Sequence, residues 1–191
     1  MAEVASKTQN YKKLLQSKEQ VNQRIGEIAD EIIKRYEAAN PLFVCLLRGG
    51  APFATKLMFA ITEKKSDFQP ELDYMTVKTY GDERVDKQPE LVMDLSPNTD
   101  VAGRMVILLD DVLDKGITAE FATNYLMQIH SAEKVDLVVL VQKLRERKTV
   151  QNATIFGFEL PDVWLTSMGM DDARLSKEAN RWRGDIAEAN Q

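Results

Sequence analysis

Apolar positions along the chain recur with two different periods, and each period predicts one kind of element. Between residues 14 and 36 apolar side chains return every three or four positions, which predicts an amphipathic helix that ends before Asn40-Pro41. We expect strands over 42–47, 72–79, 104–109, 135–141, 154–158 and 163–166, and further helices over 52–62 and 118–130. Residues 80–89 are polar and lack a period, so we expect a mobile loop there.

The order of these elements predicts the fold class. Strands and helices alternate, and the strands are almost continuously apolar, a combination that favours an α/β fold with a mostly parallel core sheet flanked by helices. In such sheets ligands bind beyond the carboxyl ends of the strands. Three strand ends carry polar groups directly after an apolar run, and they are therefore candidate site segments: residues 47–50, 109–111 and 141–143.

Composition narrows the class of protein. The chain has 191 residues, of which 44% are hydrophobic and 29% are charged, and this fits a single folded domain over 1–191. No apolar run approaches the ~20 residues that span a bilayer, and residues 1–18 lack the apolar stretch of a secretory signal. A net charge of −5 argues against nucleic-acid partners. Because Cys45 is the one cysteine, no intrachain disulfide can form, and we expect a reducing compartment, the cytoplasm.

Residues 106–118 carry the clearest chemistry in the chain. A buried strand runs into the adjacent acids Asp110 and Asp111, and Asp114 follows in a short turn before a helix. The helix N-terminus offers backbone N–H groups that favour an anion such as phosphate, and these belong to Lys115, Gly116, Ile117 and Thr118. Asp110 and Asp111 offer acceptors for a sugar diol or for Mg²⁺. The simpler interpretation is that Asp114 and Thr118 merely cap the helix.

The whole string, a strand followed by D-D-x-x-D-x-G-x-T and a helix, resembles the 5-phosphoribosyl-1-pyrophosphate (PRPP) binding motif of the type I phosphoribosyltransferases. The resemblance extends from about residue 11 to residue 171, and it is to the purine-salvage branch, the hypoxanthine-guanine phosphoribosyltransferases. It implies that the acids and the phosphate-binding turn of this string bind PRPP. Arg48 and Gly49 fall in the family's pyrophosphate loop, and Thr79 and Tyr80 fall at the start of its flexible catalytic loop.

Further matches concern the purine base and the metal. Lys143 falls where a family lysine contacts the exocyclic oxygen of the purine, and residues 157–162 are similar to the family's G-F-x-I-P-D. The resemblance places Trp164 on the ring of the base, with Leu165 beside it. Asp171 matches a family aspartate that helps to hold Mg²⁺ at the pyrophosphate, to which Asp110 and Asp111 of the same motif would contribute through ribose or water.

The reaction implied by the resemblance is transfer of the 5-phosphoribosyl group from PRPP to N9 of hypoxanthine or guanine, which yields IMP or GMP and pyrophosphate. Asp114 is the candidate to accept or relay a ring proton, and Mg²⁺ is the expected cofactor. The family also implies a small hood over the base, built from the N-terminal segment and 157–191 on a core of about 37–156, and a homodimer or homotetramer. Two alternatives stay open: transfer to another base such as xanthine, and a non-enzymatic PRPP-sensing regulator on the same fold.

Several positions depart from the family pattern. Arg48 stands where lysine is common. The arginine guanidinium is planar and presents several donors, whereas the lysine ammonium is a compact charge. Lys115 stands where threonine is common, which adds a positive charge beside the 5′-phosphate. The family arginine that follows the metal-binding aspartate has no clear counterpart here, because three residues are candidates for it: Lys177, Arg181 and Arg183.

Three other features have plain structural interpretations. Cys45 lies in mid-strand between apolar neighbours, so we expect an inert core thiol. His130 is expected to be a solvated histidine at a helix end. Residues 145–148 are all charged, so we expect a solvated turn there.

Overall fold

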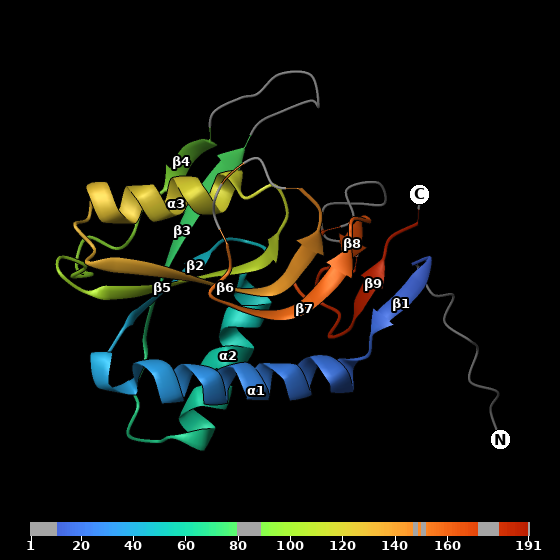
Figure 1. The fold of residues 1–191 in the computed structure, drawn as a ribbon, viewed down its shortest axis with the longest axis horizontal. Coiled ribbons are helices and arrows are strands. Elements are labelled where there is room, and N and C mark those ends of the chain that lie inside the picture. Colours follow the sequence, from blue (N-terminus) through green and yellow to red (C-terminus); the bar gives the residue numbers. More distant parts are fainter. Residues whose placement is uncertain (1–10, 80–88, 147–148, 150–151, 172–179, 191) are drawn as a thin grey trace.

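A computed structural model describes residues 11–79, 89–146, 149, 152–171 and 180–190 of the chain (Figure 1). Its helices are α1 (Lys18–Tyr36), α2 (Ala51–Lys64) and α3 (Ile117–Gln128), with the short 3₁₀ turn η1 (Glu37–Ala39) after α1. One sheet contains β2 (Leu42–Leu46), β3 (Glu71–Thr79), β4 (Pro89–Met93), β5 (Met105–Leu113), β6 (Lys134–Leu144) and β7 (Ile155–Pro161). A second sheet contains β1 (Lys13–Gln16), β8 (Leu165–Thr166) and β9 (Ile186–Glu188).

The larger sheet has the strand order β4-β3-β2-β5-β6-β7. The neighbouring pairs from β3 to β7 are parallel, and β4 pairs antiparallel with β3 at one edge. The prediction of an α/β fold with a mostly parallel core sheet is therefore confirmed. β2, β5 and β6 lie in the interior of the sheet, which explains why their sequences are almost continuously apolar.

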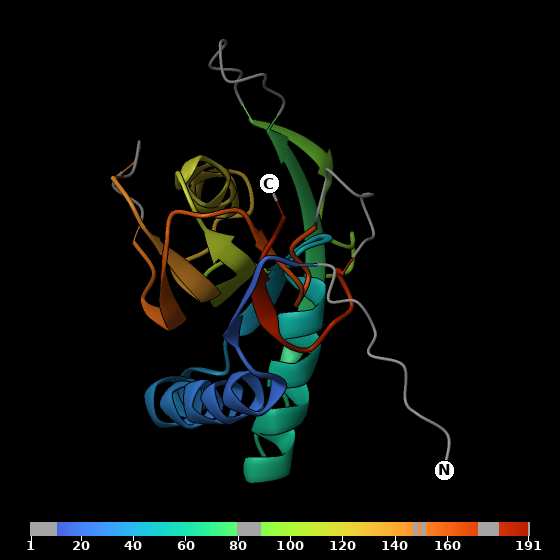
Figure 2. The same cartoon turned by 90° about the vertical axis from the view of Figure 1, so that its right-hand side faces the viewer.

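Helices cover both faces of this sheet. Because side chains alternate along a strand, Phe43 and Ile107 pack with α1 and α2, whereas Val44 and Leu108 pack on the opposite side with α3. Figure 1 shows α1 and α2 below the sheet and α3 above it, and Figure 2 shows the same layers from the side. The result is two apolar cores separated by one layer of strands.

The smaller sheet, which we call the hood, has the order β1-β9-β8, and both of its pairings are antiparallel. It joins segments that are far apart in the sequence, since Lys13 pairs with Glu188. Figure 1 shows it at the end of the larger sheet to which the arrowheads of β6 and β7 point. The hood therefore adjoins the carboxyl ends of the parallel strands.

The prediction of a helix from residue 14 was wrong for its first residues, which form β1. The helix begins at Lys18 because Ser17 and Gln20 form a capping box. The Ser17 side-chain oxygen accepts from the Gln20 N–H at 3.3 Å, and the Gln20 side chain accepts from the Ser17 N–H at 2.8 Å. Apolar residues before this cap are free to form a strand, although their spacing continues the helical pattern.

The strands that reach the site are longer than predicted. β5 continues to Leu113 and β6 to Leu144, although polar side chains interrupt both runs, because ladder hydrogen bonds join backbones rather than side chains. β7 continues to Pro161, because it is an edge strand and an edge tolerates the missing N–H of proline. The expected core boundary at residue 156 therefore falls within a strand. β4 was not predicted and begins at Pro89; the rest of the expected loop lies outside the described residues.

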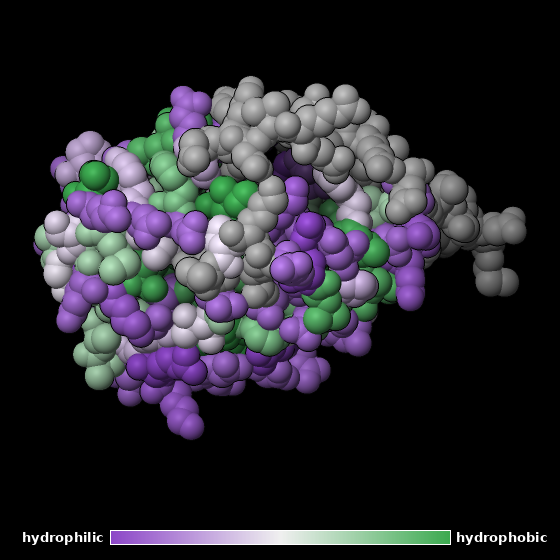
Figure 3. All heavy atoms as spheres, turned by 45° about the horizontal axis from the view of Figure 1, so that its top comes forward, coloured by the Kyte–Doolittle hydropathy of each residue, from purple (hydrophilic) through white to green (hydrophobic). Residues whose placement is uncertain are grey.

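Surface polarity agrees with the charged composition. Hydrophilic residues predominate on the face shown in Figure 3, with apolar residues scattered between them. Across the described part of the chain, no helix has both the length and the apolar character that crossing a membrane requires.

Candidate active site

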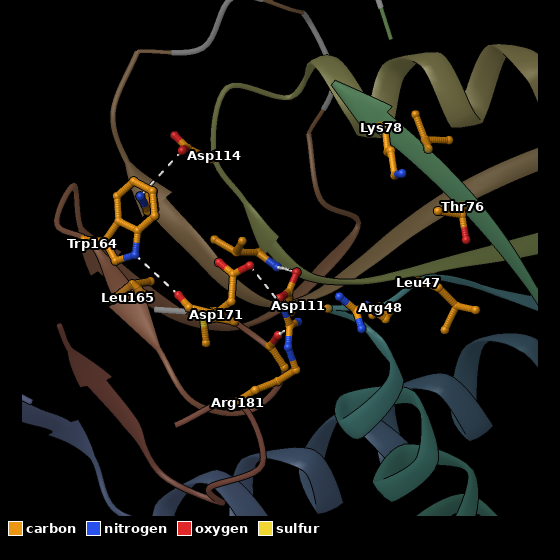
Figure 4. Close-up of a pocket in the computed structure, with 16 residues that line it drawn as sticks. Leu47, Arg48, Thr76, Lys78, Asp111, Asp114, Trp164, Leu165, Asp171 and Arg181 are labelled. Carbon is orange, nitrogen blue, oxygen red and sulfur yellow. Dashed lines mark hydrogen bonds and ion pairs between the residues drawn. The ribbon is translucent and has the colours of Figure 1, made fainter. Parts of the chain in front are cut away.

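A pocket of about 420 Å³ opens at the carboxyl ends of β2, β5 and β6, between the larger sheet and the hood (Figure 4). This is the position that the topology of a parallel sheet predicts for a ligand. Many of the residues predicted from the sequence line it together: Arg48, Gly49, Asp111, Asp114, Lys143, Trp164, Leu165 and Asp171. Residues separated by more than a hundred positions in the chain are thus brought to one cavity.

Some predicted residues lie apart from this lining. Within the described residues, neither Asp110 nor the phosphate-binding turn 115–118 contributes to it. Thr79 is the last residue of β3, and Tyr80 lies outside the described residues. Residues 115–118 come one residue after the end of β5 and include the first two residues of α3, so they lie at the same edge of the sheet as the pocket.

Asp110 and Asp111 are consecutive residues of β5 at a point where strand alternation is interrupted, since Leu109 and Val112 pack on one face of the sheet and Leu108 and Leu113 on the other. Asp111 faces the pocket against Gly49, where an added Cβ would lie 2.3 Å from Asp111 Oδ2. A side chain at position 49 would therefore force the Asp111 carboxylate to move. Burial, reinforced by the charge of Asp111, raises the pKa of Asp110 well above its usual value. Burial raises the pKa of Asp111 as well, against hydrogen bonds that lower it. A cation or hydroxyl donors beside these acids would favour their charged forms.

The turn before α3 has the backbone geometry of an anion site. Gly116 has a φ of 82°, a left-handed conformation that a side chain would strain, and it occupies the N-cap position of α3. The first N–H groups of a helix have no partner within it, and the helix dipole favours negative charge there. The simpler interpretation, in which Asp114 or Thr118 caps the helix, is wrong because neither occupies the cap.

Asp114 belongs to a group of four charged side chains, which we call the charge cluster: Asp114, Lys143, Arg145 and Asp162. Arg145 Nη1 lies 2.8 Å from Asp114 Oδ1 and 3.3 Å from Asp162 Oδ1. Lys143 Nζ lies 3.5 Å from Asp114 Oδ2 and 3.6 Å from Asp162 Oδ1. The prediction of a solvated turn at 145–148 was therefore wrong for Arg145, while 147–148 lie outside the described residues.

Asp171 lies on the other side of the pocket, between an arginine and an indole ring (Figure 4). Arg181 Nη2 is 3.0 Å from Asp171 Oδ2, and Nη1 of the same arginine donates to the carbonyl of Gly169. The indole Nε1 of Trp164 donates to the Asp171 carbonyl at 3.3 Å. These bonds fix the edge of the pocket that carries the predicted metal-binding carboxylate.

Among the described candidates for the family arginine, Arg181 is the one that lines the pocket. It is 5% exposed and lines the cavity, whereas Arg183 pairs with Asp185, with a shortest distance of 2.5 Å. Lys177 lies outside the described residues. The local sequence does not distinguish Arg181 from Arg183, because they lie only two positions apart. Only the fold of the chain between β8 and β9 decides which of them points into the pocket.

The sequence analysis missed a group of lining residues on β3, namely Thr76, Val77 and Lys78. The last parallel pair between β2 and β3 joins Leu46 to Met75, so the following residues of β3 extend beyond the end of β2. Figure 4 shows Thr76 and Lys78 on the side of the pocket opposite Trp164. Unequal lengths of neighbouring strands could have indicated this, since the longer strand projects past the sheet edge where ligands bind.

Two interpretations outside the site can be compared with the structure. Cys45 is fully buried, and burial raises the pKa of its thiol above the usual value, so the prediction of an inert core thiol is confirmed. His130 follows α3, but it is not merely solvated. Its Nε2 lies 2.8 Å from Asp94 Oδ1, the carboxylate to which the Tyr125 hydroxyl donates at 2.7 Å.

Comparison with known proteins decides the family. The model of the phosphoribosyl transferase domain matches residues 12–173, most of the chain. The chain belongs to this family. A curated relative of this phosphoribosyl transferase, the hypoxanthine-guanine phosphoribosyltransferase of Bacillus subtilis, is 30% identical over 165 residues, which cover 86% of the chain and 87% of that protein. The bifunctional protein TilS/HprT of Listeria innocua is 32% identical over 86% of the chain, but the chain spans only 24% of that longer protein.

The fold comparison agrees with the family. The crystal structure of a hypoxanthine-guanine phosphoribosyltransferase from Bacillus anthracis superimposes with a TM-score of 0.81 and 25% sequence identity, and it covers 94% of this chain and 99% of that one. The resemblance drawn from the motifs is thereby confirmed for the family and for the fold.

Proposed function

We propose that this phosphoribosyl transferase moves the 5-phosphoribosyl group of PRPP to N9 of hypoxanthine or guanine and releases pyrophosphate. One observation carries the proposal: a single pocket is lined by two arginines suited to pyrophosphate, Arg48 and Arg181, and by two residues suited to a purine, Lys143 and Trp164. Figure 4 shows Arg48 and Trp164 on different sides of this cavity. The names of relatives about as long as this chain support the same reaction.

The phosphates of PRPP fit two separate parts of the site. The N-terminus of α3 receives the 5′-phosphate, which orients the ribose from a position remote from its reacting carbon. Arg48 and Arg181 face the pyrophosphate. As the bond between C1 and the pyrophosphate breaks, negative charge grows on the leaving group, and cations already fixed in place stabilise that charge without reorganisation.

The base fits the side of the pocket with the charge cluster. The Lys143 ammonium has only donors, so it matches the acceptor at C6 of hypoxanthine or guanine and opposes the amino group of adenine. Trp164 provides an aromatic face for stacking, and its bond to the Asp171 carbonyl fixes the ring. Asp114 lies within 3.5 Å of Lys143 and accepts or relays the proton that the purine ring loses.

Mg²⁺ is the proposed cofactor, and the residues present fit it. Asp111 and Asp171 bring carboxylate oxygens to one pocket, and Mg²⁺ commonly binds one or two carboxylates together with substrate phosphates and water. In the described ranges no group of three or more His, Cys, Asp or Glu side chains is arranged to hold a metal. This donor set suits an ion that arrives with the pyrophosphate. When bound, Mg²⁺ would supply positive charge to the leaving group.

A screen of bases tests the proposed function. Purified protein is mixed with PRPP and Mg²⁺ and with hypoxanthine, guanine, xanthine, adenine, uracil or orotate in turn, and nucleotide formation is followed by absorbance. We expect IMP and GMP from the first two bases and no product from adenine. Turnover of xanthine alone would favour the other-base alternative, and PRPP binding without turnover of any base would favour the regulator.

Two further expectations accompany this proposal. A homodimer or homotetramer is expected from the family resemblance, and light scattering of the purified protein tests it. The cytoplasm is expected from cysteine usage, and fractionation of the source cells tests it.

A further inference from the structure

Arg145 lies outside every motif that pointed to this family, yet it makes a closer contact to the proposed proton acceptor than Lys143 does. Its Nη1 is 2.8 Å from Asp114 Oδ1, whereas Lys143 Nζ is 3.5 Å from Asp114 Oδ2. The same guanidinium nitrogen is 3.3 Å from Asp162 Oδ1, and Lys143 is 3.6 Å from that oxygen. For both carboxylates the arginine is therefore the nearer cation.

The backbone explains how both cations reach one place. β6 ends at Leu144, so Arg145 is the first residue after it, and the contacts that Lys143 and Arg145 both make to Asp114 and Asp162 place the two cations on one side. The Arg145 N–H donates to the Lys143 carbonyl at 3.0 Å, which closes a tight turn there. Asp114 comes from the segment after the neighbouring strand β5, and Asp162 from the segment after β7. The strand order β5-β6-β7 thus places the two cations between the two carboxylates.

The two cations of the charge cluster are more buried than its two carboxylates. The side chain of Lys143 is 11% exposed and that of Arg145 is 28% exposed. Nε of Arg145 is buried and has no hydrogen-bond partner among the described residues. The carboxylate of Asp114 is 38% exposed, so water screens its attraction to the guanidinium in part, although less than between two fully exposed side chains.

The charge cluster contains two cations and two carboxylates. This equality determines whether Lys143 can turn from the carboxylates to the base. If Arg145 were absent, the Lys143 ammonium would be the one cation between two carboxylates and would be drawn toward them. With Arg145 present, both carboxylates keep a cation when a Lys143 donor turns to a carbonyl oxygen of the base. We infer that Arg145 is a positioning residue, which rests on the proposed function: it holds the Asp114 carboxylate in one orientation and releases Lys143 to bind the 6-oxo group.

Substitution of Arg145 tests this role. We expect Arg145→Met to lower kcat/KM for hypoxanthine by roughly 10- to 100-fold, through a lower kcat and a higher KM for the base, while KM for PRPP stays within about twofold. Arg145→Lys keeps the charge and should recover part of the loss. Arg104→Met is the matched control, because Arg104 is 22% exposed and lies 2.7 Å from Glu71, remote from the pocket. It should show wild-type kinetics.

A second substitution separates charge balance from general structural damage. In the Arg145→Met background, Asp162→Asn removes the carboxylate that then competes for Lys143, so the double variant should turn over hypoxanthine faster than Arg145→Met alone. A structural defect at Arg145 would not be repaired in this way. Circular dichroism and thermal midpoints confirm folding, and Arg145→Gln replaces Arg145→Met if the latter does not fold.

The outcomes are distinguishable. Absence of hypoxanthine turnover in the wild type would overturn the proposed function and this inference with it. An active wild type with unchanged kinetics in Arg145→Met would overturn the inference alone. Equal losses in Arg145→Met and Arg145→Lys, with no gain from Asp162→Asn, would also overturn it.

Discussion

In the proposed function, the donors of Lys143 decide which base the pocket accepts. The ammonium offers donors only, and it lies within 3.6 Å of the carboxylates of Asp114 and Asp162. An adenine amino group facing it would leave two donors opposed in a desolvated space. Leaving a buried polar group unpaired in this way costs about 1–3 kcal/mol.

Replacing Lys143 by Gln should therefore relax the choice of base. A glutamine amide presents either a donor or an acceptor, so the ratio of kcat/KM for hypoxanthine to that for adenine should fall, and the hypoxanthine rate itself should also fall. Steady-state kinetics with both bases measure this ratio. Trp164→Ala is the companion variant, since loss of stacking should weaken all accepted purines together. An unchanged ratio in Lys143→Gln would remove Lys143 from base recognition.

Asp114 is the proposed proton acceptor of the reaction. Asp114→Asn should lower kcat by about 10²-fold or more and leave PRPP affinity within roughly tenfold, because general acid–base groups contribute mainly to the chemical step. Single-turnover measurements give the chemical rate, and PRPP titration gives the affinity. Asp67→Asn is a suitable control, since Asp67 is an exposed partner of Lys65 far from the pocket. Wild-type turnover in Asp114→Asn would exclude the assigned role.

At the scale of elements, β4 and α3 are joined by a small polar group at the surface. Asp94, which follows β4, accepts from the Tyr125 hydroxyl at 2.7 Å and lies 2.8 Å from His130 Nε2. The rings of Tyr125 and His130 meet edge to face at 5.4 Å. This group fixes the end of β4 to the C-terminal end of α3, the helix whose N-terminus carries the proposed phosphate-binding turn.

The Asp94 contacts predict a pH dependence of stability. Burial acts to raise the pKa of Asp94, but hydrogen bonds from Tyr125 and His130 outweigh it and leave that pKa below its usual value. A carboxyl with a depressed pKa in the folded state adds stability above its unfolded pKa of about 3.9, and this is lost as pH falls through the folded pKa. Asp94→Asn should lower the free energy of unfolding by no more than about 1 kcal/mol at pH 7, since the group is partly exposed.

Urea unfolding of the wild type and of Asp94→Asn at pH 7 and at successively lower pH measures this difference. The gap between the two proteins should narrow as the pH falls below the ordinary carboxyl range. A gap that is independent of pH would mean that the contacts act through packing rather than through charge.

The sequence predicted best those elements whose signal is local. The run at 42–47 became β2 almost unchanged, because a buried parallel strand is apolar throughout. β1, β4 and β9 were missed because each is short and lies in a sheet that forms only through distant partners. The candidate site residues also divide into those with a local sequence signal and those that depend on distant partners. The residues of the D-D-x-x-D string were found by pattern, whereas Arg145 and Arg181 required knowledge of which distant carboxylates they face.

At the scale of the whole molecule, an acidic chain binds a polyanionic substrate. The net charge of −5 repels PRPP at long range, and the pocket adds two carboxylates, Asp111 and Asp171, to that repulsion. Arg48 and Arg181 compensate locally, but Asp171 already engages Arg181 at 3.0 Å. A divalent cation that arrives with the substrate is the simplest source of the remaining positive charge.

Removal of divalent cations should therefore abolish turnover. Protein and PRPP are stripped of metal and assayed with excess EDTA, and activity should return on addition of Mg²⁺ or Mn²⁺. Thermal midpoints with and without EDTA should agree, because no structural metal is proposed. Full turnover in EDTA would contradict the proposed cofactor.

The pairing of β1 with β9 has a consequence for synthesis of the chain. Lys12 Nζ lies 2.6 Å from Glu188 Oε1, a contact between residues 176 positions apart. A chain made at about 5–20 residues per second exposes β1 roughly 10–35 s before β9 exists. Throughout that interval the first strand has an unpaired edge, while the strands of the parallel sheet emerge one after another and find their neighbours. On the ribosome, the sheet that adjoins the carboxyl ends of the parallel strands is therefore completed after the parallel sheet itself.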